Sequence, residues 1–360
     1  MKYINLKKYG RQKDSFYFAL EKYLLTIDGD YSFLWTVFPA VIIGKHQIIN
    51  QEINQQALEK NNIGLFRRQS GGGAVYSDEG CIKYTFISKT LSKDDLYFYS
   101  LNKIKDFLKI LGLDAEFSGR NDILINGYKF SGNAYYQTKD GRVLHGTILF
   151  DTDLGKMSKV LTPTKEKLES KGVKSVRSRV TNLSNLVNLS REEFICLLEK
   201  YLNQNEKNLS IEEEKIINNY KKEFETIEWI YQDKLIYPEI KRKRYNFGEV
   251  VLNYQLHNGI IKAMKVLGDF FEKEEVNQLE KSLINFDLKS LELPIDVSNY
   301  IENMTNEEFL NLLKGQDTNE WKHPFLAKEN PTLWNFKRGW WPVCWVCRIF
   351  YACQFWKRNY

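Results

Sequence analysis

Residues 67–76 of the chain read RRQSGGGAVY. Arg67 and Arg68 lead into a Ser-Gly-Gly-Gly turn, and an apolar, strand-like segment begins at Ala74. Three successive glycines cost conformational entropy, but they let the backbone approach a ligand closely with its N–H groups pointing inward. Arginine supplies a planar, permanently charged fork that suits phosphate or carboxylate. The stretch therefore predicts a cradle for an anionic ligand, and the alternative is a surface hairpin with basic neighbours.

A second informative stretch, residues 119–134, reads GRNDILINGYKFSGNA. Residues 122–125 are expected to form a strand, and Asn-Gly at 126–127 is a typical tight hairpin turn. The returning strand carries Lys129 between two aromatic residues, and because side chains alternate along a strand, Lys129 is expected to point opposite to both. The small residues Ser131, Gly132 and Ala134 leave room for a ligand beside it. The alternative is a solvated lysine on an edge strand.

Apolar periodicity predicts alternating helices and strands through the first 150 residues, which is typical of a sheet covered by helices. The expected helices are 12–26, 52–61 and 96–111, and the expected strands are 31–37, 40–43, 63–67, 81–88 and 145–150. Residues 153–185 are rich in lysine and arginine and are expected to form a mobile loop. Such a loop is either solvated or a flap that closes over a nucleotide. Two helical segments are expected within 190–225.

The length of 360 residues allows two domains, and the basic run at 241–244 marks an expected boundary. We therefore expect a catalytic domain at 1–244 and an accessory domain at 245–314. In the accessory domain, two strands joined by His-Asn-Gly form a predicted hairpin, followed by two helices. The predicted strands are 247–256 and 259–267, and the predicted helices are 273–285 and 305–314.

The tail, residues 315–360, differs from the rest of the chain. It holds six of the eight tryptophans and three of the five cysteines, and it has no clear helix or strand period. A frameshifted or otherwise foreign end would look like this, and the alternative is a membrane-surface or partner-binding segment. We expect a chain that ends at Lys314 to remain active.

Composition excludes several classes of protein. Apolar residues make up 43% and charged residues 27%, as in ordinary soluble globular proteins. Of the net charge of +6, the tail carries +4 and residues 1–314 only +2, so no nucleic-acid partner is expected. The first residues lack the apolar run of a signal peptide, and no apolar stretch of about 18 residues occurs, so we expect a cytoplasmic protein without a membrane span.

The five cysteines do not suggest a disulfide framework, because they are few and irregularly spaced. Cys344 and Cys347 form a C-x-x-C pair, but a fourth ligand at zinc-site spacing is not evident.

Four motifs together resemble the lipoate–protein ligase A family in their order and spacing. They are RRQSGGGAVYSDEG, GRNDILINGYKFSGNAYYQT, HGTILF and KGVKSVRSRVTNL, and the similarity runs from about residue 1 to residue 313. The resemblance implies an α/β (α+β) fold: a class II synthetase-like, biotin ligase-like catalytic domain with a mixed sheet and flanking helices, plus a small α+β accessory domain. One departure is Cys81, which stands where the family usually has asparagine, so the polar contacts of that amide are in question here.

The resemblance also implies a reaction in two steps. Lipoate and ATP, with Mg²⁺ accompanying the nucleotide, give lipoyl-AMP and pyrophosphate, and a lysine of an acceptor protein then attacks the mixed anhydride. The implied acceptors are E2 lipoyl domains of 2-oxoacid dehydrogenases and the glycine cleavage H protein, and the ligase is expected to be a monomer.

The resemblance assigns roles to residues of the two glycine-rich motifs. The implied ATP-binding residues are Arg68, Gly73, Ala74, Val75, Tyr76 and Lys129. The implied lipoate-binding residues are Lys129, Arg67, Ser70, Gly71, Gly72 and His145. Lys129 is the implied catalytic residue, because a fixed cation between the lipoate carbonyl and the phosphate stabilises the charge that builds up there. Asp122 is expected to orient Lys129 or to take part in holding Mg²⁺; other metal ligands are unknown.

Three other functions compete with this interpretation. An octanoyl transferase of the same fold would need no ATP and would use a cysteine nucleophile, for which Cys81 is a candidate without an evident base nearby. A biotin ligase would have a more arginine-rich glycine motif. A non-catalytic lipoate binder would not need both Arg68 and Lys129.

Overall fold

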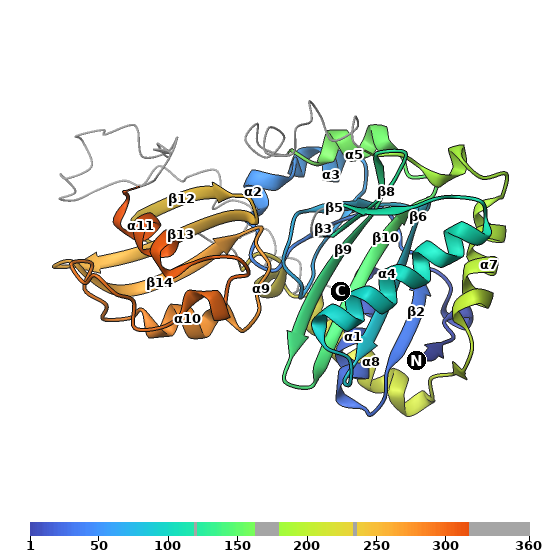
Figure 1. Ribbon diagram of the computed structural model, residues 1–360, viewed down its shortest axis with the longest axis horizontal. Helices are drawn as coiled ribbons and strands as arrows, with labels where there is room; N and C mark the ends of the chain where they lie inside the picture. Colours follow the sequence, from blue (N-terminus) through green and yellow to red (C-terminus); the bar gives the residue numbers. More distant parts are fainter. Residues whose placement is uncertain (119–120, 163–179, 233–235, 317–360) are drawn as a thin grey trace, which may run out of the picture. The chain divides into compact units, whose positions relative to one another are not determined.

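The computed structural model describes residues 1–118, 121–162, 180–232 and 236–316. An eight-stranded mixed sheet forms the centre of the larger domain (Figure 1). In order across the sheet, the strands are β11 (Glu206–Lys207), β1 (Lys2–Ile4), β2 (Tyr31–Trp35), β6 (Cys81–Ser88), β10 (Gly141–Leu149), β9 (Tyr128–Thr138), β8 (Asp122–Ile125) and β7 (Glu116–Ser118). Strand β1 runs parallel to both of its neighbours, and the other pairs are antiparallel.

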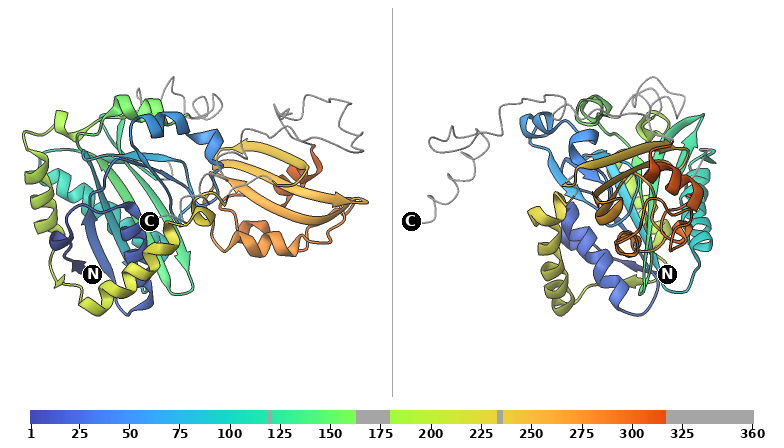
Figure 2. Two further views of the ribbon diagram at one scale, coloured as in Figure 1. Left: turned by 180° about the vertical axis from the view of Figure 1, so that it is seen from behind. Right: turned by 90° about the vertical axis from the view of Figure 1, so that its left-hand side faces the viewer.

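Helices cover both faces of this sheet. Helices α4 (Lys93–Ile110) and α7 (Arg191–Leu202) pack on one face, and α4 lies in front of the strands in Figure 1. Helices α1 (Asp14–Thr26) and α8 (Ile211–Phe224) pack on the other, and α8 faces the viewer after a turn of 180° (Figure 2, left). Because successive side chains of a strand point to opposite faces, Tyr84 and Phe86 of β6 meet the first pair of helices, whereas Ile87 meets the second. The predicted α/β (α+β) class is confirmed.

A small second sheet presents the glycine turn. Its order is β4 (Gly64–Arg67), β3 (Ala40–Ile43) and β5 (Val75–Ser77). Residues 68–74 connect β4 to β5, so the Ser-Gly-Gly-Gly sequence joins two strands that lie on either side of β3. The single helix predicted at 52–61 is divided into α2 (Ile49–Glu52) and α3 (Gln55–Lys60), because Ile53 is extended and Asn54 caps the second helix through the N–H of Ala57.

The loop predicted at 153–185 begins with a helix, α5 (Leu154–Val160). Asp153 caps this helix by accepting a hydrogen bond from the N–H of Lys156, and Met157 and Val160 are buried against the small sheet. The prediction of a loop was therefore wrong over these residues, since two apolar side chains one turn apart anchor a helix despite the surrounding lysines. Most of the predicted flap, residues 163–179, lies outside the described residues.

The accessory domain is a three-stranded antiparallel sheet with short helices. Its elements are β12 (Glu239–Tyr245), β13 (Gly248–His257), β14 (Ile260–Gly268), α10 (Val276–Ser282), η4 (Val297–Asn299) and α11 (Asn306–Lys314). The predicted hairpin is confirmed, and its turn contains Asn258 and Gly259, both with positive φ. The basic run 241–244 forms part of β12 and pairs with β13, so the boundary expected at 244 falls inside a strand.

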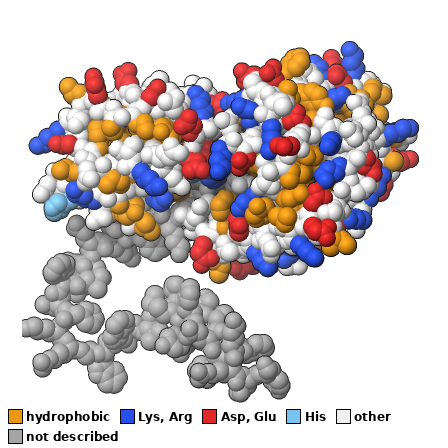
Figure 3. Space-filling view, turned by 90° about the horizontal axis from the view of Figure 1, so that it is seen from below, with side chains coloured by type: hydrophobic (Ala, Val, Ile, Leu, Met, Phe, Trp, Pro, Cys, Tyr) orange, Lys and Arg blue, Asp and Glu red, His pale blue; other side chains and the backbone are white. Residues whose placement is uncertain are grey.

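The remaining elements of the described chain are short. They are η1 (Lys7–Tyr9), η3 (Leu183–Asn185) and α9 (Ile227–Ile230). Within the described ranges, every helix is too short or too polar to cross a membrane. On the face drawn in Figure 3, Lys and Arg side chains are interspersed with Asp and Glu. The tail predicted to be foreign to the fold, from residue 317 on, lies beyond the part of the chain that the structure describes.

Candidate active site

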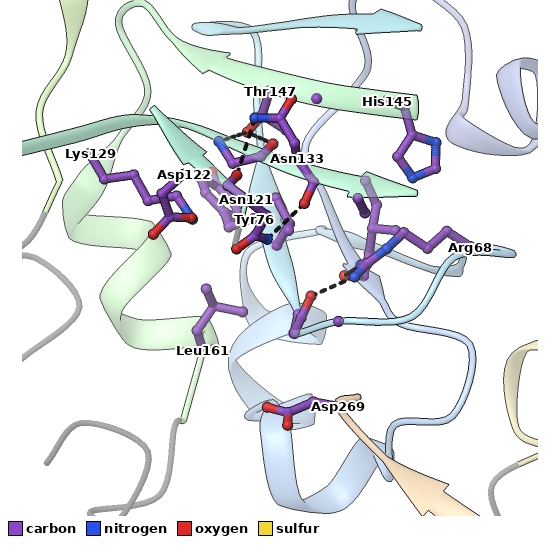
Figure 4. Close-up of a pocket in the computed structure, with 18 of the residues that line it drawn as sticks. Arg68, Tyr76, Asn121, Asp122, Lys129, Asn133, His145, Thr147, Leu161 and Asp269 are labelled. Atoms are coloured by element: carbon purple, nitrogen blue, oxygen red, sulfur yellow. Dashed lines mark hydrogen bonds and ion pairs between the residues drawn. The ribbon is translucent and has the colours of Figure 1, made fainter. Parts of the chain in front are cut away.

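A cavity of about 300 Å³ brings the two glycine-rich motifs together. Figure 4 shows Lys129 and Asp122 on one side of it and Arg68 on the other. Residues of α1, α2, α5, β2, β3, β6, β10 and the accessory domain also line it. The lining residues are Phe18, Trp35, Ile42, Glu52, Arg68, Gly72, Gly73, Ala74, Val75, Tyr76, Lys83, Asn121, Asp122, Lys129, Phe130, Gly132, Asn133, Ala134, His145, Gly146, Thr147, Leu149, Met157, Leu161, Val180, Arg244, Asn246, Phe247, Gly248, Asp269 and Phe271.

Arg68 holds the glycine turn in shape. Its side chain is 5% exposed, and its guanidinium donates hydrogen bonds to Ser70 Oγ (2.9 Å), Gly71 O (2.7 Å) and Gly73 O (2.9 Å). Burial and the neighbouring Arg67 lower the pKa of Arg68 to about 10, which leaves it charged at neutral pH. Arg68 therefore stabilises the turn through these hydrogen bonds, and its positive charge lies at the cavity wall.

The first two glycines meet the accessory domain. A Cβ on Gly71 would lie 2.2 Å from the carbonyl oxygen of Phe270, and Gly72 has a φ of +87°, in the left-handed region. The N–H of Gly72 donates to Phe270 O (3.1 Å), so this donor is engaged by protein and does not point into an open cradle as the sequence predicted. Gly72, but not Gly71, lines the cavity.

Arg67 points elsewhere. It is fully buried, and its guanidinium donates to the carbonyl oxygens of Gly44, Lys45, Gln47 and Ile230 at 2.9–3.0 Å. It does not line the cavity, so this placement gives no support to the predicted lipoate contact. Adjacent residues at the end of a strand face opposite ways, and only Arg68 faces the cavity.

Ser70 is hydrogen-bonded to His145, and His145 is hydrogen-bonded in turn to a buried glutamate. Ser70 Oγ lies 2.8 Å from His145 Nε2, and His145 Nδ1 lies 2.9 Å from Glu21 Oε1. Glu21, from α1, also accepts hydrogen bonds from Thr85 and Tyr136. His145 lines the cavity and Ser70 does not, so Ser70 links the histidine to Arg68.

Glu21 is not among the residues predicted from the sequence, although a signal for it is present. A carboxylate among the apolar residues of a predicted amphipathic helix has to be paired when it is buried.

A β-bulge sets the direction of Lys129. Ile123 of β8 pairs with Ser131 and the next residue pairs with Lys129, so Phe130 is left without a partner. The extra residue places Lys129 on the same face as Gly132, whereas the simple alternation assumed from sequence would place it with Ser131. Its Nζ lies 2.6 Å from Asp122 Oδ1, and a Cβ on Gly132 would lie 2.6 Å from this Nζ.

A second lysine lines the cavity from β6. Lys83 is buried, its Nζ lies 2.7 Å from Asp14 Oδ1, and it lies 4.5 Å from the ring centroid of Trp35. Burial raises the pKa of the Asp14 carboxyl, and the adjacent lysine opposes this effect. Lys83 is not among the site residues predicted from the sequence. The available signal was a lysine in the middle of a strand that otherwise reads as fully buried.

Cys81 does not have the environment of a nucleophile. It is fully buried, does not line the cavity, and burial raises its pKa to about 11. The thiol is therefore protonated at neutral pH, and a thiolate is the reactive form of cysteine.

The side chains described here do not form a metal site by themselves. Among residues 1–118, 121–162, 180–232 and 236–316, no group of three or more His, Cys, Asp or Glu side chains could hold a metal ion. Asp122 is the carboxylate next to Lys129, with which it forms an ion pair.

Two family models match the chain. The lipoyl protein ligase A/B catalytic domain matches residues 14–203, and the bacterial lipoate protein ligase C-terminus matches residues 237–313. Lipoate-protein ligase LplJ of Bacillus subtilis is 34% identical over 317 residues, which covers 82% of this chain and 95% of the relative. Lipoate–protein ligase 1 of Staphylococcus aureus is 32% identical, with the same coverage of both chains.

Solved structures have the same fold. LipL1 of P. falciparum, determined in complex with lipoate, has a TM-score of 0.69 at 23% identity and covers 88% of this chain and 98% of its own. A bipartite lipoate protein ligase of Thermoplasma acidophilum, studied with its E2 lipoyl domain, has a TM-score of 0.56 at 27% identity and covers 66% and 98%. A lipoate-protein ligase A bound with ATP has a TM-score of 0.53 at 24% identity and covers 62% and 99%. Because both family models match and curated relatives align over most of their length, the chain belongs to the lipoate–protein ligase family.

Proposed function

We propose that this protein activates lipoate with ATP to form lipoyl-AMP and pyrophosphate, and then transfers the lipoyl group to a lysine of an acceptor protein. One observation carries the site assignment. The Lys129–Asp122 pair and Arg68 with its glycine turn lie across one cavity in a chain of this family.

Lys129 is the proposed catalytic residue. Attack of the lipoate carboxylate on the α-phosphate brings two negative groups together, and a fixed ammonium between them stabilises the charge of the transition state. The 2.6 Å contact with Asp122 holds Nζ over Gly132, where no side chain intervenes. We assign Asp122 to this orienting role.

The glycine turn is the proposed nucleotide site. Gly73, Ala74, Val75 and Tyr76 line the cavity, and Arg68 stabilises the turn from behind while adding a positive charge. Arg68 has carbonyl and hydroxyl partners for its guanidinium, so its contribution is to hold the turn and to supply the field of its charge. His145, held by Ser70 and Glu21, is proposed to lie beside the lipoate chain.

Mg²⁺ is proposed to arrive with the nucleotide. This ion keeps several waters and binds through one or two carboxylates together with substrate phosphates, so a dedicated protein cage is not required. The acceptors are proposed to be E2 lipoyl domains and the glycine cleavage H protein, by analogy with the archaeal ligase that was studied with its E2 lipoyl domain. A cytoplasmic location and a monomeric state are part of the same proposal.

The test is a mass measurement on an isolated lipoyl domain after incubation with the protein, lipoate and MgATP. We expect a mass increase of one lipoyl group that requires ATP. Transfer from an acyl carrier protein without ATP would favour the transferase instead. Formation of lipoyl-AMP without any modified acceptor would identify a lipoate binder or an enzyme that catalyses only the first step.

A further inference from the structure

Five residues form a continuous row across the floor of the cavity. Each is paired with the next on the neighbouring strand, and all five line the cavity. From β2 to β8 the row is Trp35, Lys83, Thr147, Gly132 and Asp122. Directly opposed residues of neighbouring strands share one face, so the row forms one surface.

The two ends of this row differ in chemistry. At one end, the Nζ of Lys129 lies against Gly132 and next to Asp122. At the other end stand Lys83 and Trp35. Neighbouring strands are about 4.8 Å apart, so the Cα atoms of Lys83 and Gly132, two strands apart, are separated by about 10 Å. A medium-length acid with its carboxylate at Lys129 therefore reaches Lys83 with its far end.

Lys83 is an unusual group for the end of an acyl slot. An ammonium has three N–H donors. The carboxylate of Asp14 accepts one of them, and the face of the Trp35 ring lies 4.5 Å from the nitrogen. Because Lys83 is 2% exposed, a ligand that fills the slot becomes part of the immediate surroundings of this charge.

We infer that Lys83 makes the site selective for acids whose far end carries a sulfur ring, as in lipoate, over straight alkyl acids of the same chain length. The inference rests on the proposed function. Ring sulfurs are polarisable and have lone pairs that an ammonium N–H can approach, as thioethers do. An alkyl end excludes water from the ammonium without replacing its hydrogen bonds, which costs binding free energy.

The first test uses the unaltered protein and three acids. Pyrophosphate release is measured with lipoate, with octanoate, and with the carbocyclic analogue of lipoate in which both ring sulfurs are CH₂ groups. We expect kcat/KM for lipoate to exceed the other two by about tenfold, the effect of one poorly satisfied buried donor. Equal use of lipoate and its carbocyclic analogue would show that ring shape decides, and would overturn the inference.

The second test removes the charge. Lys83→Met is combined with Asp14→Asn so that no buried carboxylate is left unpaired, and the octanoate-to-lipoate ratio of kcat/KM is expected to rise about tenfold. The matched control is Lys22→Met, since Lys22 also pairs with a carboxylate (Glu223) and lies over a ring (Tyr220), but does not line the cavity.

The outcomes separate the inference from the function on which it rests. Circular dichroism checks that the double variant is folded. If the folded double variant has the same octanoate-to-lipoate ratio of kcat/KM as the Lys22→Met control, the selectivity assigned to Lys83 is overturned. If the double variant does not fold, the three-acid series decides alone. Pyrophosphate release with none of the acids would overturn the proposed function itself.

Discussion

Lys129 is the residue on which the proposed chemistry depends. Its side chain is only 23% exposed and is held by Asp122, so its removal should affect the transition state more than the fold. We expect Lys129→Ala to reduce lipoate-dependent pyrophosphate release by about 100-fold or more, with an unchanged circular dichroism spectrum. Lys139→Ala, an exposed lysine in the turn that follows the same strand, is the control. Activity of Lys129→Ala within a few-fold of the unaltered protein would contradict the assigned role.

The reactivity of Cys81 distinguishes a ligase from a transferase that uses a cysteine nucleophile. Because burial raises its pKa to about 11, the folded protein keeps this thiol protonated at pH 8, whereas Cys196 is exposed. We expect iodoacetamide at pH 8 to label Cys196 but not Cys81 until the protein is unfolded, as measured by peptide mapping. Cys81→Ala should retain activity within a few-fold. A folded but inactive Cys81→Ala variant would support the transferase.

Candidate site residues could be predicted from the sequence where they lie within a local motif. Arg68 and Lys129, which line one cavity, could be singled out because glycines and a hairpin turn mark their positions. Glu21 and Lys83 were missed because their partners lie 124 and 69 positions away along the chain, and no local pattern connects them. Arg67 and Arg68 have opposite roles because side chains alternate at the end of β4. Which of the two faces the cavity depends on what packs around this strand, and the sequence alone does not show that.

At the scale of the element, the bulge at Phe130 places Lys129 against Gly132, which lies three positions further along β9. A Cβ at Gly132 would lie 2.6 Å from Lys129 Nζ and 2.8 Å from its Cε, and the flexible lysine would have to move. We expect Gly132→Ala to lower pyrophosphate release by about tenfold or more, with little change in Tm.

Gly146→Ala, on the neighbouring strand, is the contrasting variant. Its Cβ would lie 2.3 Å from Asn133 Oδ1 and 2.4 Å from Tyr84 Cζ, which are buried, so a lower Tm is expected. Full activity of Gly132→Ala would show that the position of Nζ over this glycine is not needed.

Asp30 joins the start of β2 to the end of β6. Burial alone would raise its pKa, but hydrogen bonds from the Lys89 N–H and the hydroxyls of Ser88 and Thr90 outweigh burial and lower the pKa. A carboxyl with a lowered folded-state pKa contributes stability above its unfolded pKa of about 4, and this contribution is lost as the pH falls through the folded value.

We therefore expect Asp30→Asn to lower the free energy of unfolding by about 1–2 kcal/mol at pH 7, and by less at pH 3.5. Urea unfolding at the two pH values measures the difference. Asp140→Asn, at an exposed turn, should change little at either pH. A difference for Asp30→Asn that is as large at pH 3.5 as at pH 7 would contradict the sign of the pKa shift.

Elements with a clear period were predicted correctly, and the exceptions have physical causes. Helix α5 was missed because two buried residues, Met157 and Val160, fix it within a basic sequence. The bulge at Phe130 was missed because it depends on pairing with β8, which a single strand does not reveal. The predicted boundary falls in strand β12 because its lysines and arginines suggest a linker, although its backbone pairs with β13 along its whole length.

For the whole molecule, the buried apolar residues of the described chain form separate clusters. One core consists of accessory-domain residues alone, and it includes Phe309, Leu312 and Leu313 of α11. Two other clusters combine residues of the large sheet with α1, α4, α7 and α8, and a further one combines residues of the small sheet with α2, α3 and α5. Contacts such as that of Gly71 with Phe270 join residues about 200 positions apart, and no local pattern in the sequence predicts them.

The extent of the chain that the fold needs can be tested at the end of α11. This helix begins with a capping box of Thr305 and Glu308 and ends at Gly315, whose φ of +71° and N–H bond to Leu312 O form its C-cap. The N–H of Gln316 adds a bond to Asn311 O. A chain that ends at Gln316 therefore keeps the whole cap, whereas the end at Lys314 suggested by sequence would remove it.

We expect the chain that ends at Gln316 to keep full activity and an unchanged Tm. A chain that ends at Glu308 loses three fully buried side chains, each worth about 2–3 kcal/mol, and we expect its accessory domain to unfold. Because Phe270 of that domain contacts Gly71 and Gly72, its loss should also lower pyrophosphate release. Thermal unfolding and activity measured on both chains provide the comparison. Insoluble or inactive protein from the chain that ends at Gln316 would show that the residues beyond it belong to the working enzyme.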